Sequence, residues 1–346
     1  MPRTRRTGVD DAVSVTMTGD AALMIGVDLG GSKVEATLVD RHGTVLGGSR
    51  RPTSPERGPH GILADLVACL AEHCLASAER PVLGAGVGVA GQVDPATGTV
   101  LHAPNLKWND FPLKALLEEA IDLPVFVIND VQAATYGEWT CGAGRGAEDI
   151  VCLFVGTGIG GGVVSHGSLI LGCGGTAGEL GHTTIDWHGP QCTCRNRGCL
   201  EAFAAGWAIA RRARDVVTEQ PDEGRRLIAL ADGAIGNLTA KVVAQAARDG
   251  DPLAARLVRE TGEALGVGVA SIANAFNPCM VILGGGVIEG MPELVGMAEA
   301  EARRRALAAA LHSLEVVKAG LGKHAGTVGA ATWARRSLAT AGTGTG

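Results

Sequence analysis

The chain has 346 residues, of which 46% are hydrophobic and 19% charged, and its formal net charge is −6. This length provides a large buried core and favours two domains, while the acidic balance argues against a broad surface for nucleic acid. No uncharged apolar stretch reaches the roughly 18 residues that a membrane span needs. The nine cysteines are an odd number, which favours free thiols in a reducing compartment and therefore a cytoplasmic protein.

Residues 1–21 form a polar leader with a short basic run, and they lack the apolar stretch of a signal peptide. We expect this leader to be disordered, as chain termini often are. We place a smaller N-terminal α/β domain at residues 22–134 plus about 322–337, and a larger C-terminal α/β domain at residues 135–321. The Gly- and Thr-rich residues 338–346 are expected to form a disordered tail.

Short β-rich runs alternate with longer segments of helical spacing, a pattern typical of an α/β fold. In the first half of the chain we expect strands at Leu23–Asp28, Val34–Val39, Thr44–Ser49, Val82–Val89 and Val125–Ile128, and helices at Ile62–Ala78, Leu113–Ile121 and Asp130–Trp139. In the second half we expect strands at Ile150–Val155, Val163–Ser165, Met280–Leu283 and Leu314–Ala319, and helices at Glu201–Thr218, Thr239–Arg248, Pro252–Asn274, Pro292–Leu311 and Thr327–Arg336.

One combination of elements occurs twice. A strand, a glycine turn and a second strand begin at Leu23, and the same combination begins again at Ile150. Internal duplication is a strong indication of related structural units. We therefore expect two related domains that face each other across a cleft.

The first glycine turn reads Asp28-Leu-Gly-Gly-Ser-Lys33. Gly30 and Gly31 let backbone N–H groups point at anionic oxygens, Ser32 can donate a hydrogen bond, and Lys33 adds positive charge. Asp28 can hold Mg²⁺ directly or through water. The turn is therefore a candidate phosphate site, although the segment taken alone also fits an ordinary hairpin.

The second glycine turn, Gly156–Gly162, leaves little side chain to pack between two apolar strands, as expected where a ligand fills the space. It is not a Walker A loop, because no Gly-Lys-Ser/Thr follows. A third turn ends the strand predicted at Met280–Leu283 and can admit a nucleoside. We expect nucleotide or phosphate contacts from Gly156, Thr157, Gly158, Gly160, Gly284, Gly285 and Gly286.

Asn129 and Asp130 end one predicted strand and open a predicted helix. A carboxylate at a strand end that faces a cleft can accept a proton from a hydroxyl group, as phosphoryl transfer requires. Asp130 can also be the N-cap of the helix, a role worth about 1 kcal/mol. The two roles can coexist.

The most specific local pattern is a set of four potential metal ligands: His182, Cys192, Cys194 and Cys199. Four nitrogen and sulfur ligands match a closed tetrahedral zinc site, which stiffens a loop with little core of its own. His188 or Asp186 can replace His182 as the fourth ligand. Because no coordination position stays open, the predicted zinc is structural.

Polar side chains flank this cluster, with Glu179 before it and Glu201 directly after it, and Asn105 lies in another loop. Carboxylates and amides suit sugar hydroxyls because each forms several hydrogen bonds. Taken singly, Glu201 also fits a charge at a helix start, and Asn105 also fits a turn residue.

Joined, these motifs resemble the ROK family of bacterial sugar kinases and related repressors, on the actin/hexokinase-like ATPase fold. The resemblance extends from about Met24 to Arg336. The family signature appears as Gly178-Glu-Leu-Gly-His182, followed by Cys192-Thr-Cys-Arg-Asn-Arg-Gly-Cys-Leu-Glu201. The chain departs from the pattern at three positions: Ser32 replaces threonine, Arg195 replaces glycine, and Gln132 stands where the family often has asparagine.

The resemblance implies a glucokinase-like enzyme that uses ATP and Mg²⁺ to phosphorylate a hexose, with glucose converted to glucose 6-phosphate, and that carries structural Zn²⁺. Asp130 is implied as the catalytic base, and the zinc ligands are the four named above. The implied sugar-binding residues are Asn105, Asn129, Asp130, Glu179, His182 and Glu201. A homodimer or homotetramer fits the same resemblance.

Several alternatives stay open. Other acceptors are N-acetylmannosamine, N-acetylglucosamine, fructose, mannose and allose, because small differences in pocket shape decide among them. Polyphosphate can replace ATP as the donor. A non-catalytic, sugar-responsive regulator is a further alternative. However, only about 20 residues precede the first predicted strand, fewer than the helix-turn-helix of a repressor requires.

Overall fold

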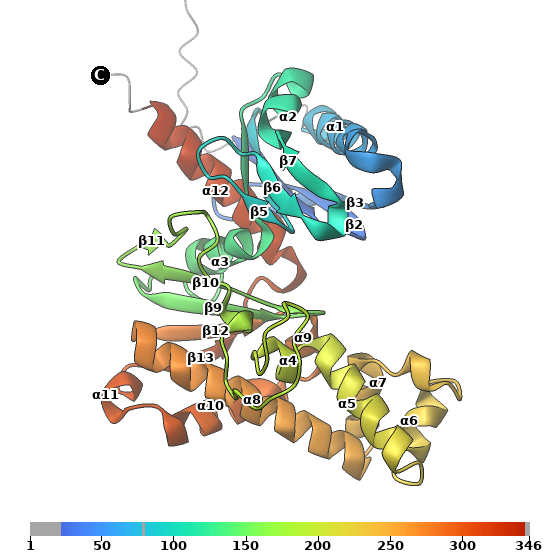
Figure 1. The fold of residues 1–346 in the computed structure, drawn as a ribbon. Helices are drawn as coiled ribbons and strands as arrows, with labels where there is room; N and C mark the ends of the chain where they lie inside the picture. The colour runs from blue at the N-terminus through green and yellow to red at the C-terminus, as the bar shows by residue number, and fades with distance from the viewer. Residues whose placement is uncertain (1–21, 78–79, 343–346) are drawn as a thin grey trace, which may run out of the picture.

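The structure is a computed structural model that describes residues 22–77 and 80–342. The predicted leader at 1–21, residue 78 of the first predicted helix and the tail residues 343–346 lie outside these ranges. The described chain forms two stacked lobes, each built on a five-stranded sheet (Figure 1). Within both ranges, no helix is long and apolar enough to span a membrane.

The upper lobe of Figure 1 carries the first sheet and the helices that cover it. Its elements are β1 (Leu23–Leu29), β2 (Lys33–Val39), β3 (Val45–Pro52), α1 (Gly58–Ala76), β4 (Val82–Val89), β5 (Gln92–Val93), β6 (Val100–Ala103), β7 (Trp108–Phe111), α2 (Leu113–Ile121) and β8 (Val125–Asn129). The main sheet has the order β3-β2-β1-β4-β8, with β1 antiparallel to β2 and parallel to β4. Strands β5, β6 and β7 form a small separate sheet that the sequence analysis did not predict.

Strand β1 is buried on both faces, because helices cover each side of the sheet. Ile25 packs in one core with α1 and α2, whereas Met24 points the other way and packs against α12 (Ala325–Gly342). Gly26 also faces α12, and a Cβ atom there would lie 1.8 Å from the carbonyl oxygen of Thr327. This glycine therefore allows α12 to approach the sheet closely.

The lower lobe repeats the same sheet. Its elements are β9 (Ile150–Val155), β10 (Ile159–Ser165), β11 (Ser168–Leu169), α4 (Glu201–Ala204), α5 (Gly206–Glu219), α6 (Arg225–Leu230), α7 (Ala240–Arg248), α8 (Pro252–Phe276), β12 (Met280–Gly284), α9 (Gly286–Gly290), α10 (Glu293–Arg305), α11 (Ala308–Leu311) and β13 (Glu315–Lys318). The order β11-β10-β9-β12-β13 places β9 antiparallel to β10 and parallel to β12. The duplication predicted from the sequence is therefore confirmed in the topology.

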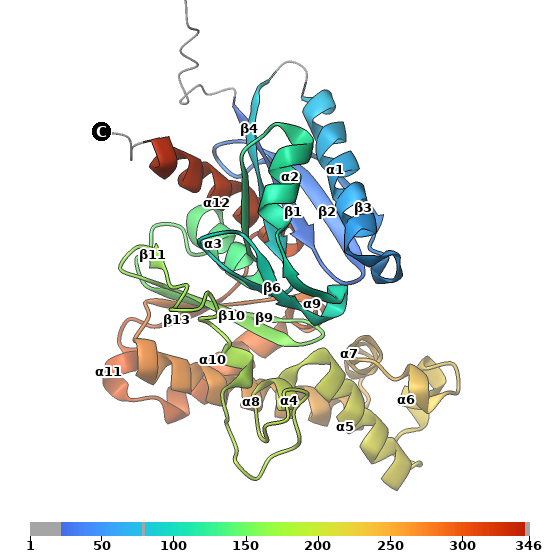
Figure 2. The same cartoon turned by 45° about the horizontal axis from the view of Figure 1, so that its top comes forward.

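Helices α3 (Asp130–Cys141) and α12 pack against each other at the waist between the two sheets (Figures 1 and 2). Their contact is close because a Cβ atom on Gly329 would lie 1.7 Å from the carbonyl oxygen of Ala133. Helix α3 begins where β8 ends. The first turn of α12 lies beside β1, since a Cβ atom on Gly326 would lie 3.2 Å from the carboxyl carbon of Asp28. Each helix therefore begins beside the C-terminal end of a strand of the upper sheet.

One predicted helix is broken beside the second glycine turn. The segment Glu201–Thr218 forms two helices, α4 and α5, because Ala205 is extended with φ −67° and ψ 158°. The backbone N–H of Gly206 donates to the carbonyl oxygen of Gly156 at 2.9 Å. The break therefore ties the start of α5 to the second glycine turn.

Two further boundaries differ from the sequence analysis. The predicted helix Pro292–Leu311 is broken into α10 and α11 where Ala306 and Leu307 are extended. The closing helix does not stop at Arg336 but continues to Gly342. Residues 338–342, predicted as part of a disordered tail, are therefore helical.

Candidate active site

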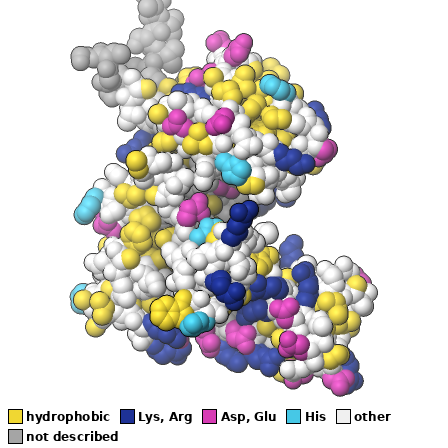
Figure 3. All heavy atoms as spheres, viewed as in Figure 1, with side chains coloured by type: hydrophobic (Ala, Val, Ile, Leu, Met, Phe, Trp, Pro, Cys, Tyr) yellow, Lys and Arg dark blue, Asp and Glu magenta, His cyan; other side chains and the backbone are white. Residues whose placement is uncertain are grey.

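A cavity of about 550 Å³ opens between the two lobes. In the space-filling view the waist is mostly uncoloured surface, as expected where glycines and backbone form the wall (Figure 3). The predicted site residues that line the cavity are Asn105, Asn129, Asp130, Gly156, Gly158, Gly160, Glu179, His182, Glu201 and Gly285. The fold thus brings together residues that lie far apart in the sequence.

The start of α3 supplies one side of the cavity. Asn129 is the N-cap of this helix, since its Oδ1 accepts hydrogen bonds from the backbone N–H groups of Val131 and Gln132, each at 3.0 Å. The expectation that Asp130 caps the helix is therefore wrong, because Asp130 is the first helical residue. The cap instead holds Asp130 in place, and Asn129 Nδ2 donates to its Oδ1 at 3.0 Å.

The surroundings of the Asp130 carboxylate raise its pKa. Burial, together with the negative charges of Asp28 and Glu179, raises the pKa of Asp130 to about 6, against the lowering effect of a hydrogen bond from the Val131 N–H. A base with a pKa just below neutral is largely ionised at pH 7 and still accepts a proton readily. Asp130 therefore has the environment that a catalytic base requires.

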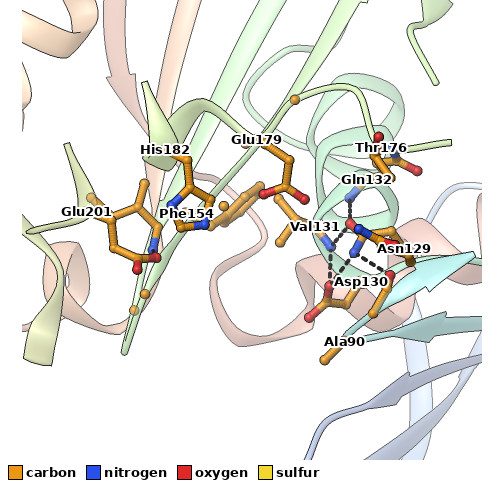
Figure 4. Close-up of a pocket in the computed structure, with 18 of the residues that line it drawn as sticks. Ala90, Asn129, Asp130, Val131, Gln132, Phe154, Thr176, Glu179, His182 and Glu201 are labelled. Atoms are coloured by element: carbon orange, nitrogen blue, oxygen red, sulfur yellow. Dashed lines mark hydrogen bonds between the residues drawn. The ribbon is translucent and has the colours of Figure 1, made fainter. Parts of the chain in front are cut away.

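The opposite side of the cavity comes from the lower lobe. Figure 4 shows His182 and Glu201 on one side of the opening, Asn129 and Asp130 on the other, and Glu179 between them. Glu201 is buried, and its Oε2 accepts a hydrogen bond from the Ile159 N–H at 2.9 Å. This contact anchors the second glycine turn to α4.

The first glycine turn lies behind this cavity rather than in its wall. Among the lining residues in the described chain there is none of the set Asp28, Gly30, Gly31, Ser32 and Lys33. Gly31 packs directly on the Asn105 loop, where a Cβ atom would lie 2.7 Å from the Asn105 Cβ. The Lys33 ammonium pairs with Glu35 at 3.1 Å. The turn therefore supports the wall of the cavity through Asn105.

Asp28 is the carboxylate of this first turn. Burial raises the pKa of Asp28, the positive charge of Lys33 opposes that rise, and Glu35 adds to it. The carboxylate faces the first turn of α12 at Gly326. A buried carboxylate at a strand end, beside one cation, fits a site for a divalent cation with its phosphate ligands.

The second glycine turn is shorter than predicted. It comprises Gly156–Gly158, because β10 begins at Ile159, so Gly160 lies in a strand and packs on Val131. Thr157 and Gly286 line a second recess of about 500 Å³, whereas Gly284 lines neither space. The other lining residues of this recess include Trp207, Arg214, Lys241, Val287 and Met291.

The four predicted metal ligands come together at the edge of the cavity. The ligand atoms of His182, Cys192, Cys194 and Cys199 all lie within 4.8 Å of one another. Cys192 Sγ lies 3.7 Å from His182 Nδ1, and Cys194 Sγ lies 3.7 Å from Cys199 Sγ. A tetrahedral zinc with Zn–S bonds of about 2.3 Å separates its sulfur ligands by about 3.8 Å. The cluster fits a metal ion, and it includes neither His188 nor Asp186.

Several lining residues were missed because their roles depend on tertiary contacts. Gln92 and His102 come from the small unpredicted sheet, and Phe154 and Thr176 come from the lower lobe. Gln132, noted only as a departure from the family pattern, is buried and also lines the cavity. No sequence motif marks these residues, since each reaches the site through the packing of its element.

Two duplicated α/β lobes around a glycine-lined cavity define the class of two-domain proteins with the actin/hexokinase-like fold. Residues 24–337 match the ROK family, and the chain belongs to this family. The glucokinase of Streptomyces coelicolor is 35% identical over 316 residues, which cover 90% of this chain and 98% of that protein. The expected family and fold are confirmed.

A solved structure and a regulator complete the comparison. The crystal structure of a ROK family glucokinase from Streptomyces griseus in complex with glucose and AMPPNP matches with a TM-score of 0.79 at 38% identity, covering 91% of this chain and 99% of that chain. The xylose repressor of Bacillus subtilis is 30% identical and covers 92% of this chain, but the match covers 78% of the repressor. Both kinases and repressors are therefore relatives of this chain.

Proposed function

We propose that this protein is an ATP-dependent glucokinase that converts glucose to glucose 6-phosphate. The observation that carries the proposal is the single cavity in which Asp130 of one lobe faces Glu179, His182 and Glu201 of the other. The S. griseus relative with glucose and AMPPNP supports both the acceptor and the donor.

We infer that Asp130 is the catalytic base. Its carboxylate accepts the proton of the glucose 6-hydroxyl while the hydroxyl oxygen forms a bond to the γ-phosphorus of ATP. The bond from the γ-phosphorus to the bridging oxygen breaks, and ADP leaves with the electron pair. Because the pKa of Asp130 is about 6, the carboxylate is mostly ionised at neutral pH and ready for this step.

We infer that the two glycine turns bind different parts of ATP. The recess beside Gly156 and Thr157 suits the nucleoside, because Trp207 and Met291 provide apolar surface there. An apolar recess favours ATP over polyphosphate, which has no base to bury. Asp28 would hold Mg²⁺, which neutralises phosphate charge when it is bound.

We further propose that the four-residue cluster holds structural Zn²⁺ and that the metal orients His182. Its Nδ1 lies on the cysteine side, so Nε2 would carry the proton and donate to a sugar hydroxyl. Asn105, Asn129, Glu179 and Glu201 would complete the sugar contacts. The domains proposed at residues 22–134 with 322–337 and at 135–321 would close over the sugar and exclude water.

Formation of sugar phosphates tests the proposal. The full chain is incubated with glucose, N-acetylmannosamine, N-acetylglucosamine, fructose, mannose or allose, with ATP or polyphosphate as donor, and the products are measured by mass spectrometry. The highest kcat/KM is expected for glucose with ATP. Another preferred sugar would replace glucose as the substrate, and no product with any pair would favour a sugar-responsive regulator.

We also propose a cellular compartment and an oligomeric state for this protein. None of the nine cysteines forms a disulfide, which supports a reducing compartment such as the cytoplasm. We also expect a homodimer or homotetramer. Size-exclusion chromatography with light scattering measures this mass directly, and a monomer at micromolar concentration would contradict it.

A further inference from the structure

The loop that precedes Glu179 forms part of the cavity wall without regular secondary structure. Residues 170–179 contain no helix or strand, and Gly172, Gly175 and Gly178 all have positive φ angles, of 76°, 74° and 99°. Residues 175–179 all line the sugar cavity. A wall of this kind depends on specific contacts to hold its shape, because glycines lose much conformational freedom on ordering.

Gln132 supplies such contacts from the first turn of α3. Its side chain is only 4% exposed, and Nε2 donates hydrogen bonds to the carbonyl oxygens of Gly175 at 2.9 Å and Ala177 at 3.2 Å. Two carbonyl acceptors fix which end of the amide faces the loop. The same helical turn carries Asp130, so one short segment positions both the base and the opposite wall.

Other contacts also fix the loop. The Ile170 N–H donates to the Val163 carbonyl oxygen at 2.8 Å, and within the loop the Ala177 N–H donates to the Leu171 carbonyl oxygen at 3.0 Å. Gly175 lies against the small upper sheet, where a Cβ atom would come within 2.5 Å of the Val93 carbonyl oxygen. Gly178 lies against β10, where a Cβ atom would come within 2.5 Å of the Gly161 carbonyl oxygen. The hydrogen bonds of Gln132 hold the segment between these contacts.

A second cavity lies beside the loop, so the loop needs the Gln132 hydrogen bonds to keep its position. A second cavity of about 270 Å³ lies next to the sugar cavity, and Gln132 and Gly175 line both. Leu171 of the loop and Trp333 of α12 also line it. The close contacts of Gly175 and Gly178 fix two points of the loop, and the hydrogen bonds of Gln132 oppose its movement into this neighbouring space.

We propose that Gln132 is a positioning residue that sets sugar affinity by holding the 170–179 loop, and hence Glu179, across from Asp130. This inference rests on the proposed sugar-kinase function. It assigns a role to a position where the sequence alone indicates only a departure from the family pattern. Gln132 touches the loop, and it acts on the sugar through that loop.

The substitution Gln132→Met tests the role, because methionine has nearly the same length and no hydrogen-bond donor. The KM for glucose is expected to rise about tenfold, as for the loss of hydrogen bonds to buried carbonyl groups. The KM for ATP is expected to stay within about twofold, since no described residue of the loop lines the recess proposed for ATP. Gln132→Asn keeps the donor on a shorter chain and is expected to give an intermediate KM for glucose.

The matched control is Gln245→Met on α7, where the exposed glutamine bonds only to its neighbours Arg248 and Asp249. Hydrogen exchange of residues 170–179 provides a readout that needs no activity, and faster exchange is expected in Gln132→Met but not in the control. Unchanged glucose KM and unchanged exchange in a folded Gln132→Met protein would overturn the proposal. An inactive wild-type chain would refute the kinase function, while the exchange experiment would still decide the role of Gln132.

Discussion

The two strand–turn–strand units at the cleft have the same topology and different chemistry. The first turn carries its own charges, with Asp28 and Lys33 on either side of two glycines. The second turn, Gly156–Gly158, carries no charged side chain, and its carboxylate comes from Glu201 on α4. A Cβ atom on Gly158 would lie 2.6 Å from the Glu201 Oε2. Duplication thus preserves the backbone frame, while the charged groups differ between the copies.

This difference shows how one strand–turn–strand backbone can provide two kinds of binding site. A turn with a charged side chain suits a metal ion and its phosphates, because charge attracts charge at short range. A turn of glycines suits close approach of a ligand to backbone N–H groups. We therefore expect substitutions in the two turns to have unequal effects.

The largest of these effects is expected at Asp28. Asp28→Asn removes the carboxylate charge while it keeps the shape, so kcat should fall about 100-fold or more, as for the loss of a key electrostatic group. Thr157→Val in the second turn should cost less than about tenfold, since it removes one hydroxyl. Steady-state kinetics with saturating glucose and ATP measure both values, and equal losses in the two variants would break the comparison.

The second prediction concerns the four-residue His/Cys cluster, which has no counterpart among the described residues of the upper lobe. Cys199→Ser should abolish zinc binding and raise the KM for glucose at least about tenfold, because His182 loses the partner that orients it. The exposed Cys279 is a matched control, and Cys279→Ser should keep both zinc and KM. Metal content by mass spectrometry and glucose kinetics provide the data. A zinc-free Cys199→Ser protein with a normal KM for glucose would show that the metal does not contribute to sugar binding.

The third prediction follows from the charges that surround Asp130. The base must be ionised, so kcat/KM for glucose should rise with pH through about 6, the pKa of Asp130, and then level off. Glu179→Gln removes a nearby negative charge that helps to raise this pKa, so the acid limb should move to lower pH. Initial rates between pH 5 and 8 test both statements. A profile that stays flat down to pH 5 would contradict the assignment of Asp130.

The smallest effect is expected at Arg195, in the turn that joins Cys194 and Cys199, two of the proposed zinc ligands. Arg195 has a φ angle of 75°, which an L-residue adopts at a cost of about 1 kcal/mol relative to glycine. Arg195→Gly should therefore raise Tm by about 2 °C and leave zinc content unchanged. Calorimetry measures the shift, and a lower Tm would mean that the arginine side chain stabilises the turn by more than the backbone strain costs.

The sequence allowed the α/β class, the duplication and the metal cluster to be predicted, because these depend on local patterns. Short β-rich runs identified β1 and β9, and the cysteine spacing identified Cys192, Cys194 and Cys199. Interruptions within predicted helices were harder to predict. The segment Glu201–Thr218 reads as one helix, and only the hydrogen bond from Gly206 to the second glycine turn explains why it is two.

The candidate site was predictable only where a motif marked it. Asp130 was predicted as the base, and that stays a prediction. The N-cap of α3 was assigned to Asp130 instead of Asn129, because both residues are good N-caps and only the coordinates distinguish them. Gln132 and His102 reach the cavity through tertiary packing. The sequence contains no periodic signal for contacts between elements of different lobes.

The central claim is that a carboxylate on one lobe deprotonates a glucose hydroxyl held largely by the other. Asp130→Asn tests it most directly when turnover and glucose binding are measured on the same preparation. We predict that kcat falls by several orders of magnitude, while calorimetry shows glucose affinity within about tenfold of wild type and zinc content is unchanged. Turnover close to that of wild type would contradict the account.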